Sequence, residues 1–318
     1  PDAARPSMHR PKLFPALASI GLAFTLLSSA TLAATYPLPA PGDTVIGQMA
    51  PVELSRTETL LDVARRHSIG YQEIRRANPD VDPWLPAPDS AALLPTRYVL
   101  PDAPYEGILL NVGEMRLYYF PPPPPDGDEE VITFPVSIGR MDWNTPLGET
   151  KIVRKKADPT WTPPASIRKE HAAQGDILPD VVPAGPDNPL GQHALYLGRS
   201  GYLIHGTNRP YGIGMRVTHG CVRLYPEDVA RLFELVPVGT PVNIINQPAK
   251  AGWQEGTLYL EVHPVLDEND QLLPPDLVAI RQVVTRAAGD HADTLDWSRV
   301  DAIAYEAGGI PVSLATRP

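Results

Sequence analysis

Residues 205–223 read HGTNRPYGIGMRVTHGCVR and contain the single cysteine of this 318-residue chain. The cysteine, Cys221, follows a His-Gly pair and lies sixteen positions after a second histidine, His205. A thiol needs a nearby base or positive charge to become a thiolate at neutral pH, and a histidine supplies either. A lone cysteine is more often a small buried apolar residue. Because Cys221 lies in a polar, glycine-bounded segment, the pattern predicts a nucleophile instead.

The N-terminal region has the pattern of a secretory signal peptide. Met8 and basic residues precede an apolar run over 13–27, and small residues follow before Ala34. The run is shorter than the roughly 20 residues that span a bilayer. We therefore expect residues 1–33 to be extra N-terminal sequence plus a cleaved signal peptide, and the mature protein to be exported. An uncleaved anchor is the alternative.

Export and charge narrow the function classes. One cysteine in an exported chain cannot form an internal disulfide, which favours a catalytic thiol. The formal net charge of −10 argues against nucleic acid as a partner. The same charge gives no electrostatic reason to bind anionic lipid, so membrane contact is expected only through the signal peptide.

A small α/β module is predicted over 44–102, after an extended linker at 35–43. Thr59 opens a capping-box pattern whose helix continues to His67, and a second helix runs near 71–77. The second helix stops at Asn78, because the residue before a proline disfavours helix. A closing strand over 97–101 completes the order strand, helix, helix, strand.

A mainly β domain is predicted over 105–247, followed by a short α+β tail over 248–318. Helix 226–235 is the one clear helix of the β domain and follows the cysteine. The tail pattern indicates one strand and two helices, and no chemistry is assigned to it. Short runs of apolar or alternating residues separated by turns predict the strands of the β domain, at 108–112, 115–120, 131–136, 151–154, 194–197, 202–205 and 241–245.

The segment around Cys221 can be interpreted as a catalytic site. Strands ending at His205 and starting after Cys221 would meet at a common place, with glycines in the connecting loop. His219 and Cys221 point to the same side if extended, but His205 can approach from the neighbouring strand and is the predicted base. Gly220 lets the backbone approach a substrate carbonyl, so nearby N–H groups could form an oxyanion hole.

These motifs resemble the signature of the L,D-transpeptidases, whose catalytic unit is the YkuD-type domain. The likeness covers about 107–247 and rests on 205–208, 213–214 and 218–224, with supporting matches at 161–163 and 185–191. It implies a mainly β, sandwich-like catalytic domain. Segment 44–102 loosely resembles the LysM glycan-binding module. The layout is similar to periplasmic Gram-negative enzymes that attach the major outer-membrane lipoprotein to peptidoglycan.

The resemblance implies a role for each matching residue. Cys221 is the nucleophile and His205 the general base, oriented by the backbone carbonyl of Gly206. In the family, the thiolate attacks the carbonyl after the L-centre of meso-diaminopimelate in a tetrapeptide stem, expels D-alanine and passes the acyl group to an amine. No cofactor and no metal ion are implied. The remaining candidates are His219 and Gly220 in the oxyanion-hole turn, and Thr218, Arg223 and Trp161 on the substrate side.

Several readings stay open from the sequence. A zinc site could use His205, His219 and Cys221, although a fourth ligand is missing. A papain-like protease would place its histidine after the cysteine, not before it. Segment 44–102 alone would suit a non-enzymatic wall-binding protein, or a structural cap for the next domain. The acceptor is also open: a lipoprotein lysine, a diaminopimelate amine, a D-amino acid or water.

Overall fold

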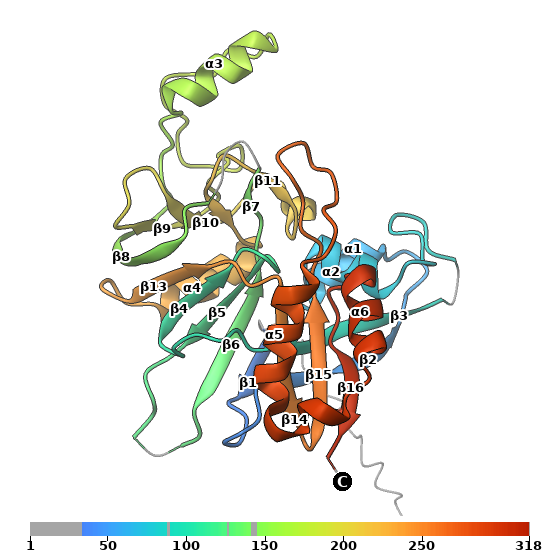
Figure 1. The fold of residues 1–318 in the computed structure, drawn as a ribbon. Helices are drawn as coiled ribbons and strands as arrows, with labels where there is room; N and C mark the ends of the chain where they lie inside the picture. The colour runs from blue at the N-terminus through green and yellow to red at the C-terminus, as the bar shows by residue number, and fades with distance from the viewer. Residues whose placement is uncertain (1–33, 88–89, 126, 141–144, 318) are drawn as a thin grey trace, which may run out of the picture. The chain divides into compact units, whose positions relative to one another are not determined.

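The architecture is mainly β, as predicted, in a computed structural model that describes residues 34–87, 90–125, 127–140 and 145–317. The signal-peptide pattern lies outside these residues. Figure 1 shows the elements along the chain. No helix in the described ranges is long and apolar enough to cross a membrane.

A nine-stranded sheet forms the body that carries Cys221 (Figure 1). All strands predicted over 105–247 are present within a few residues of the expected ends. In spatial order the strands are β1 (Ala34–Pro37), β6 (Glu130–Pro135), β5 (Arg116–Phe120), β4 (Gly107–Asn111), β13 (Pro241–Ile245), β8 (Gly148–Ala157), β9 (His193–Leu197), β10 (Leu203–His205) and β12 (Val222–Arg223).

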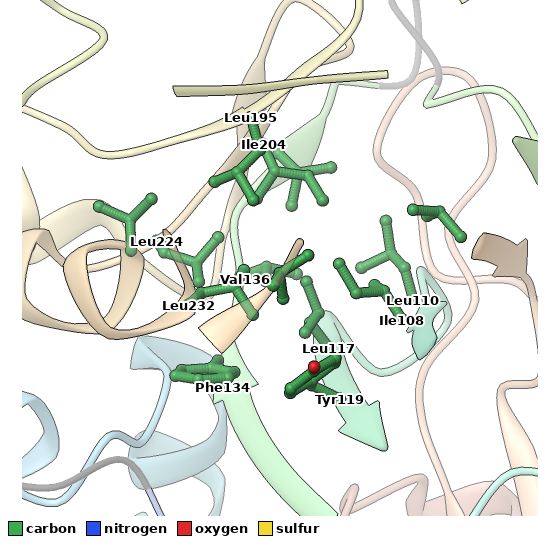
Figure 2. Close-up of a cluster of buried hydrophobic side chains, with 14 of the residues drawn as sticks. Ile108, Leu110, Leu117, Tyr119, Phe134, Val136, Leu195, Ile204, Leu224 and Leu232 are labelled. Atoms are coloured by element: carbon green, nitrogen blue, oxygen red, sulfur yellow. The ribbon is translucent and has the colours of Figure 1, made fainter. Parts of the chain in front are cut away.

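The long strand β8 turns this sheet back over its own core. Its first half pairs with β13 and its second half with β9, with a register shift between Ile152 and Arg154. Side chains from the two parts of the sheet that β8 joins therefore share one buried cluster. Figure 2 shows Leu117 and Phe134 of one part with Leu195 and Ile204 of the other. This common core gives the sheet its sandwich-like character and fixes β10 and β12 against a rigid base.

The predicted helix after the cysteine is confirmed as α4 (Pro226–Leu235). Proline suits its first turn because the missing N–H has no intrahelical partner there. Val229 and Leu232 are fully buried in the same core. A second helix, α3 (Ala165–Ala173), was not expected. Its pattern is weak because Ile167 is its one buried residue.

The strand–helix–helix–strand order over 44–102 is confirmed as β2 (Val45–Glu53), α1 (Leu60–Arg66), α2 (Tyr71–Ala77) and β3 (Ala91–Val99). The Thr59 capping box is formed, with Asp62 donating its backbone N–H to Thr59 Oγ1 at 3.1 Å. Asn78 ends α2 and ties it to β3, because its amide group exchanges hydrogen bonds with the Leu93 backbone at 2.7 and 2.9 Å. The LysM resemblance itself stays a prediction.

The linker prediction for 35–43 was wrong at its start. Residues 34–37 form β1, which pairs antiparallel with β6 at the edge of the large sheet. Tyr36 also packs edge-on against Tyr98, with 6.3 Å between ring centroids. Pro37 and the prolines after it suggested a linker, but an edge strand tolerates proline because one side of its backbone needs no ladder partner.

The tail folds as the expected α+β unit. A three-stranded antiparallel sheet packs against two helices around Trp253, Leu260, Val284 and Val300. The predicted strand is β15, and the two strands that flank it, β14 and β16, were missed. The elements are β14 (Ala249–Gln254), β15 (Thr257–Val262), α5 (Leu277–Ala288), α6 (Trp297–Glu306) and β16 (Val312–Thr316).

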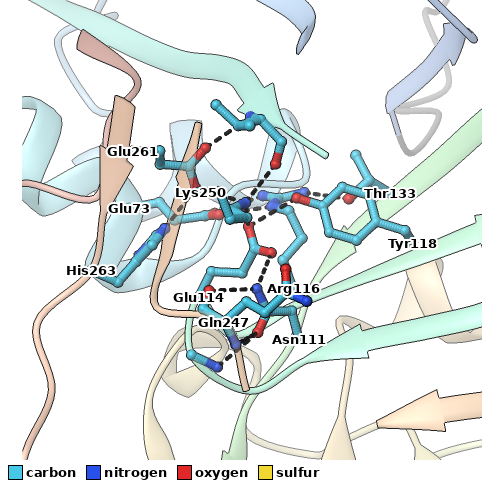
Figure 3. A network of polar contacts seen from close by, with 12 residues as sticks. Glu73, Asn111, Glu114, Arg116, Tyr118, Thr133, Gln247, Lys250, Glu261 and His263 are labelled. Carbon is cyan, nitrogen blue, oxygen red and sulfur yellow. Dashed lines mark hydrogen bonds and ion pairs between the residues drawn. The ribbon is translucent and has the colours of Figure 1, made fainter. Parts of the chain in front are cut away.

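A buried polar network joins the tail to both preceding segments (Figure 3). Lys250 Nζ lies 2.6 Å from Glu114 Oε2 and 2.9 Å from Glu261 Oε1, and it donates to the Val99 carbonyl oxygen at 2.7 Å. Burial alone would raise the pKa of Glu261, but Lys250 and His263 beside it lower that pKa to about 2. Described residues from Ala34 onward form one compact unit. The boundaries at 44–102, 105–247 and 248–318 stay predictions.

Glu114, Glu261 and His263 are the one group of metal-ligating side chains gathered in the described part of the chain. The Lys250 ammonium contacts both carboxylates, so it supplies the positive charge that a metal ion would bring. The cluster is therefore a structural ion-pair network.

Replacing Lys250 with Met should destabilise the fold by about 3–5 kcal/mol, because two buried carboxylates lose their counter-charge. Urea unfolding at pH 7 measures the loss, with the exposed Lys151→Met as the matched control. A change below about 1 kcal/mol would contradict a structural role for the network.

Candidate active site

His205 and Cys221 lie at the ends of two adjacent strands. Strands β10 and β12 are parallel neighbours, with Ile204 opposite Val222. His205 is the last residue of β10, and Cys221 directly precedes β12. Ile204 and Val222 are fully buried in the core, so the alternation of a strand fixes where their neighbours point. The two strand ends are therefore adjacent, and the role of His205 as the base stays a prediction.

The Cys221 thiol is half-buried and largely protonated at neutral pH. Burial raises its pKa, while a hydrogen bond with the Leu203 backbone and the charge of Arg223 act in the opposite direction. Its Sγ donates to the Gly201 carbonyl oxygen at 3.6 Å. In the described part of the chain, no hydrogen bond joins Sγ to an imidazole. The thiol therefore needs a base to remove its proton when substrate binds. Hydrogen bonds between a nucleophile and its base are often long without substrate and shorten in the substrate complex.

The His205 ring is buried and neutral. Burial, followed by the charge of Arg223, lowers its pKa to about 3. Its Nδ1 lies 2.7 Å from the Gly206 carbonyl oxygen. A carbonyl only accepts hydrogen bonds, so Nδ1 carries the proton and Nε2 is the unprotonated nitrogen. This tautomer is the one that a general base requires.

Two threonines fix the carbonyl groups of the turn before the cysteine. Thr218 Oγ1 donates to the Cys221 carbonyl oxygen at 2.6 Å, and Thr145 Oγ1 donates to that of Gly220 at 3.1 Å. Thr145 Oγ1 in turn accepts from the Gly139 N–H at 3.1 Å. Gly220 has φ of 94°, a conformation that disfavours any side chain. The turn geometry therefore depends on glycine at this position.

His219 is held by a helix that the sequence did not predict. Its Nε2 lies 2.8 Å from Glu170 Oε2 on α3, and Arg140 Nη1 lies 2.9 Å from Glu170 Oε1. Hydrogen bonds from Arg140 and His219 lower the pKa of Glu170 to about 2. The insertion between β8 and β9 is thus attached to the nucleophile turn. No motif marks Glu170 or Arg140, because the contact depends on how the insertion folds.

Arg223 and Trp161 have different relations to the site. The Arg223 backbone bridges Ser137, and its half-buried guanidinium interacts electrostatically with Cys221 and His205. Its buried Nε has no hydrogen-bond partner in the described ranges. Trp161 exchanges backbone hydrogen bonds with Val182 at 2.9 and 2.7 Å. Among the described residues no hydrogen bond or ring contact joins Trp161 to the catalytic pair, so its substrate role stays a prediction.

The segment over 44–102 packs on the loop between the two catalytic residues. Tyr71 donates its backbone N–H to the Ile213 carbonyl oxygen at 2.8 Å. Gly214 has φ of 88°, and a side chain there would collide with the Tyr71 backbone. Arg65 also pairs with Glu227 at 2.7 Å, on the first turn of α4. These contacts match the structural-cap reading of this segment.

The three side chains of the zinc alternative have separate partners. His205 contacts the Gly206 carbonyl, His219 contacts Glu170, and Cys221 contacts the Gly201 carbonyl. Their ligand atoms are not gathered into a common cluster among the described residues. The arrangement suits nucleophilic catalysis by a thiol with a neutral imidazole as base.

His205→Ala should slow alkylation of Cys221 by iodoacetamide at pH 7, because the thiol loses its proton acceptor. His219→Ala should slow it less, since His219 is held toward Glu170. Rates are measured from the intact mass of each variant. Equal effects of the two variants would contradict His205 as the base.

The pH profile of the wild-type protein follows from the same geometry. With a folded pKa of about 3, His205 is neutral throughout pH 5–7, so the alkylation rate should show no histidine step there. Stability should fall as pH drops from the unfolded histidine pKa of about 6.5 toward 3, because only the unfolded state binds that proton.

Glu170→Ala should release α3 and speed tryptic cleavage at Arg168 and Lys169. Two charge-assisted hydrogen bonds to Glu170 are lost. Cleavage is followed by mass spectrometry, with the exposed Glu149→Ala as control. Unchanged cleavage would show that Glu170 does not hold the helix.

Relatives named as probable L,D-transpeptidases match this chain over most of its length. Residues 106–244 match the family model described as the L,D-transpeptidase catalytic domain, YkuD. The probable L,D-transpeptidase YbiS of Escherichia coli is 45% identical over 267 residues, covering 81% of this chain and 86% of that protein. The probable L,D-transpeptidase ErfK/SrfK of Salmonella typhimurium is 40% identical over 304 residues, covering 92% and 95%.

A solved structure, L,D-transpeptidase 3 from Mycobacterium tuberculosis, is 20% identical and aligns with a TM-score of 0.31, covering 67% of this chain and 98% of that one. The family match and the two relatives, which are matched over most of their length, assign the chain to a family by sequence. This chain belongs to the L,D-transpeptidase family.

Proposed function

We propose that this L,D-transpeptidase works through an acyl-enzyme on Cys221, formed from the tetrapeptide stems of peptidoglycan. The observation that carries the proposal is the neutral His205 ring, whose Nδ1 proton is fixed by the Gly206 carbonyl. His205 ends the strand that pairs with β12, which directly follows the chain's single cysteine. This arrangement leaves Nε2 ready to take the thiol proton as the substrate carbonyl arrives.

The first half-reaction acylates the enzyme. His205 Nε2 takes the Sγ proton, and the thiolate attacks the carbonyl after the L-centre of meso-diaminopimelate. The C–S bond forms, the C–N bond to D-alanine breaks, and His205 returns the proton to the leaving amine. We assign the N–H groups of His219, Gly220 and Cys221 to the oxyanion, and Thr218 and Arg223 to the substrate side.

The second half-reaction transfers the acyl group. An acceptor amine attacks the thioester, the new C–N bond forms as the C–S bond breaks, and the amine's extra proton restores the thiol through His205. We propose a lysine of the outer-membrane lipoprotein as the acceptor. The support is the layout of the chain, which resembles enzymes of that kind. Cross-linking between two diaminopimelate residues is the alternative.

We further propose a periplasmic location, supported by the signal-peptide pattern before Ala34. Segment 44–102 is proposed to support the loop between His205 and Cys221, since it contacts Ile213 and Glu227 directly. Glycan binding by this segment is the second reading. Trp84 and Tyr211 favour it, because their exposed side chains lie together with 6.5 Å between ring centroids.

Intact-mass spectrometry tests the proposal. Purified protein is incubated with disaccharide-tetrapeptide, alone and with a lysine-terminated peptide. We expect an acyl adduct on Cys221 that moves to the peptide lysine, and a separate adduct with a carbapenem, whose strained carbonyl offers the same chemistry. Cys221→Ala should abolish both adducts.

Each result has one meaning. Transfer to the peptide lysine supports the lipoprotein acceptor, whereas dimeric muropeptides support cross-linking. Full transfer activity in Cys221→Ala would refute the mechanism. Absence of any adduct on the folded wild-type protein would leave a wall-binding protein with an inert thiol.

A further inference from the structure

A pocket of 390 Å³ lies between the sheet that carries Cys221 and the tail. Turns of the large sheet supply most of its wall, and Arg216, Pro248 and the tail segment after β15 supply the rest. Much of the lining is apolar, with a few polar groups among it. The residues used below are Val112, Thr145, Leu147, Arg216, Asn246 and Val265.

Arg216 is the one charged side chain among the described lining residues. It belongs to β11 (Arg216–Thr218), within the loop between His205 and Cys221. Its guanidinium donates to the Val112 carbonyl oxygen at 3.5 Å and interacts electrostatically with the Asp270 carboxylate. A guanidinium has five N–H donors, and within the described ranges one hydrogen bond to the Val112 carbonyl leaves further donors for a ligand. A half-buried arginine in an apolar pocket is suited to a carboxylate.

The pocket wall is continuous with the nucleophile turn. Thr145 lines the pocket and donates to the Gly220 carbonyl oxygen at 3.1 Å. Thr218, two residues after Arg216, donates to the Cys221 carbonyl oxygen at 2.6 Å. A ligand seated beside Arg216 and Thr145 therefore contacts the same structural unit that holds the thiol.

Two arginines thus lie on either side of the nucleophile turn in the sequence, and each serves a different place. Arg223 interacts electrostatically with the Cys221 thiol itself, and its buried Nε has no partner in the described ranges. That cation is available to the stem that acylates the thiol. Arg216 serves a separate pocket, partly built by the tail at Val265. A transfer reaction has two substrates, so the second cation is left for the second substrate.

We propose that the Arg216 pocket binds the carboxylate of the amine acceptor. The inference rests on the proposed function, because an acceptor exists only if an acyl-enzyme forms. The shared chemistry is an amine with a carboxylate in the same residue, as in a peptide ending in lysine or in a stem ending in diaminopimelate. The apolar lining around Leu147 and Val265 would contact the aliphatic part of that residue.

The test compares acceptors that differ only in the carboxylate. Acyl-enzyme is first formed from disaccharide-tetrapeptide, and transfer is then timed with a lysine-terminated peptide bearing a free carboxylate or an amide. The same comparison uses a disaccharide-tripeptide with free or amidated diaminopimelate. Wild type should prefer the free acid about tenfold, and Arg216→Met should remove that preference. The preferred acid identifies the acceptor source.

Two further variants serve as a charge control and as an independent test of the pocket. Arg286→Met removes a positive charge from the exposed face of α5 and should keep the preference. Val265→Glu places a competing carboxylate in the pocket at a side chain that is 41% exposed, so it should fold and should raise the acceptor KM. It tests the pocket even if Arg216→Met fails to fold.

The outcomes separate the two proposals. An acyl-enzyme that forms normally but shows no carboxylate preference, or keeps it in Arg216→Met, overturns the acceptor pocket alone. Slower acylation in Arg216→Met, with unchanged transfer, assigns the pocket to the donor and overturns the inference. Absence of an acyl-enzyme in the wild type overturns the proposed function and the pocket together.

Discussion

The parallel pairing of β10 with β12 is the constraint from which the site follows. Parallel neighbours cannot be joined by a tight hairpin, so the chain from His205 to Cys221 must cross over. That crossover brings base and nucleophile to neighbouring strands. It also carries Ile213, which contacts the N-terminal segment, and Arg216, which lines the tail pocket. One connection therefore links both the N-terminal segment and the tail to the thiol.

Burial then determines the charge state of the reacting groups. The same desolvation that raises the pKa of the Cys221 thiol lowers that of His205 to about 3. Both groups rest uncharged, so the ion pair forms only when a substrate offers compensating interactions. The Gly206 carbonyl specifies the useful tautomer without adding a charge. A resting thiol of this kind is protected from oxidation better than a thiolate.

Sequence reasoning recovered what local pattern determines. Apolar alternation located most strands of the large sheet, and the His-Gly-Cys spacing located the nucleophile turn. Glu170 and Thr145 escaped because their role depends on contacts across long sequence separation, with no motif around them. The edge strand at 34–37 escaped because its prolines suggested a linker. Lys250 lay in a tail to which no chemistry was assigned, since its partners Glu114 and Glu261 come from two different segments.

The buried ion pairs also determine which segments of the chain depend on one another. Arg116, fully buried on β5, pairs with Glu73 of α2 at 2.7 Å, and Glu114 needs Lys250 of the tail. A fragment limited to the matched residues 106–244 would keep Arg116 and Glu114 but lose both counter-ions. Cutting the chain between these segments would therefore leave buried charges without partners. The three segments that the sequence suggests therefore fold as one compact unit over the described residues.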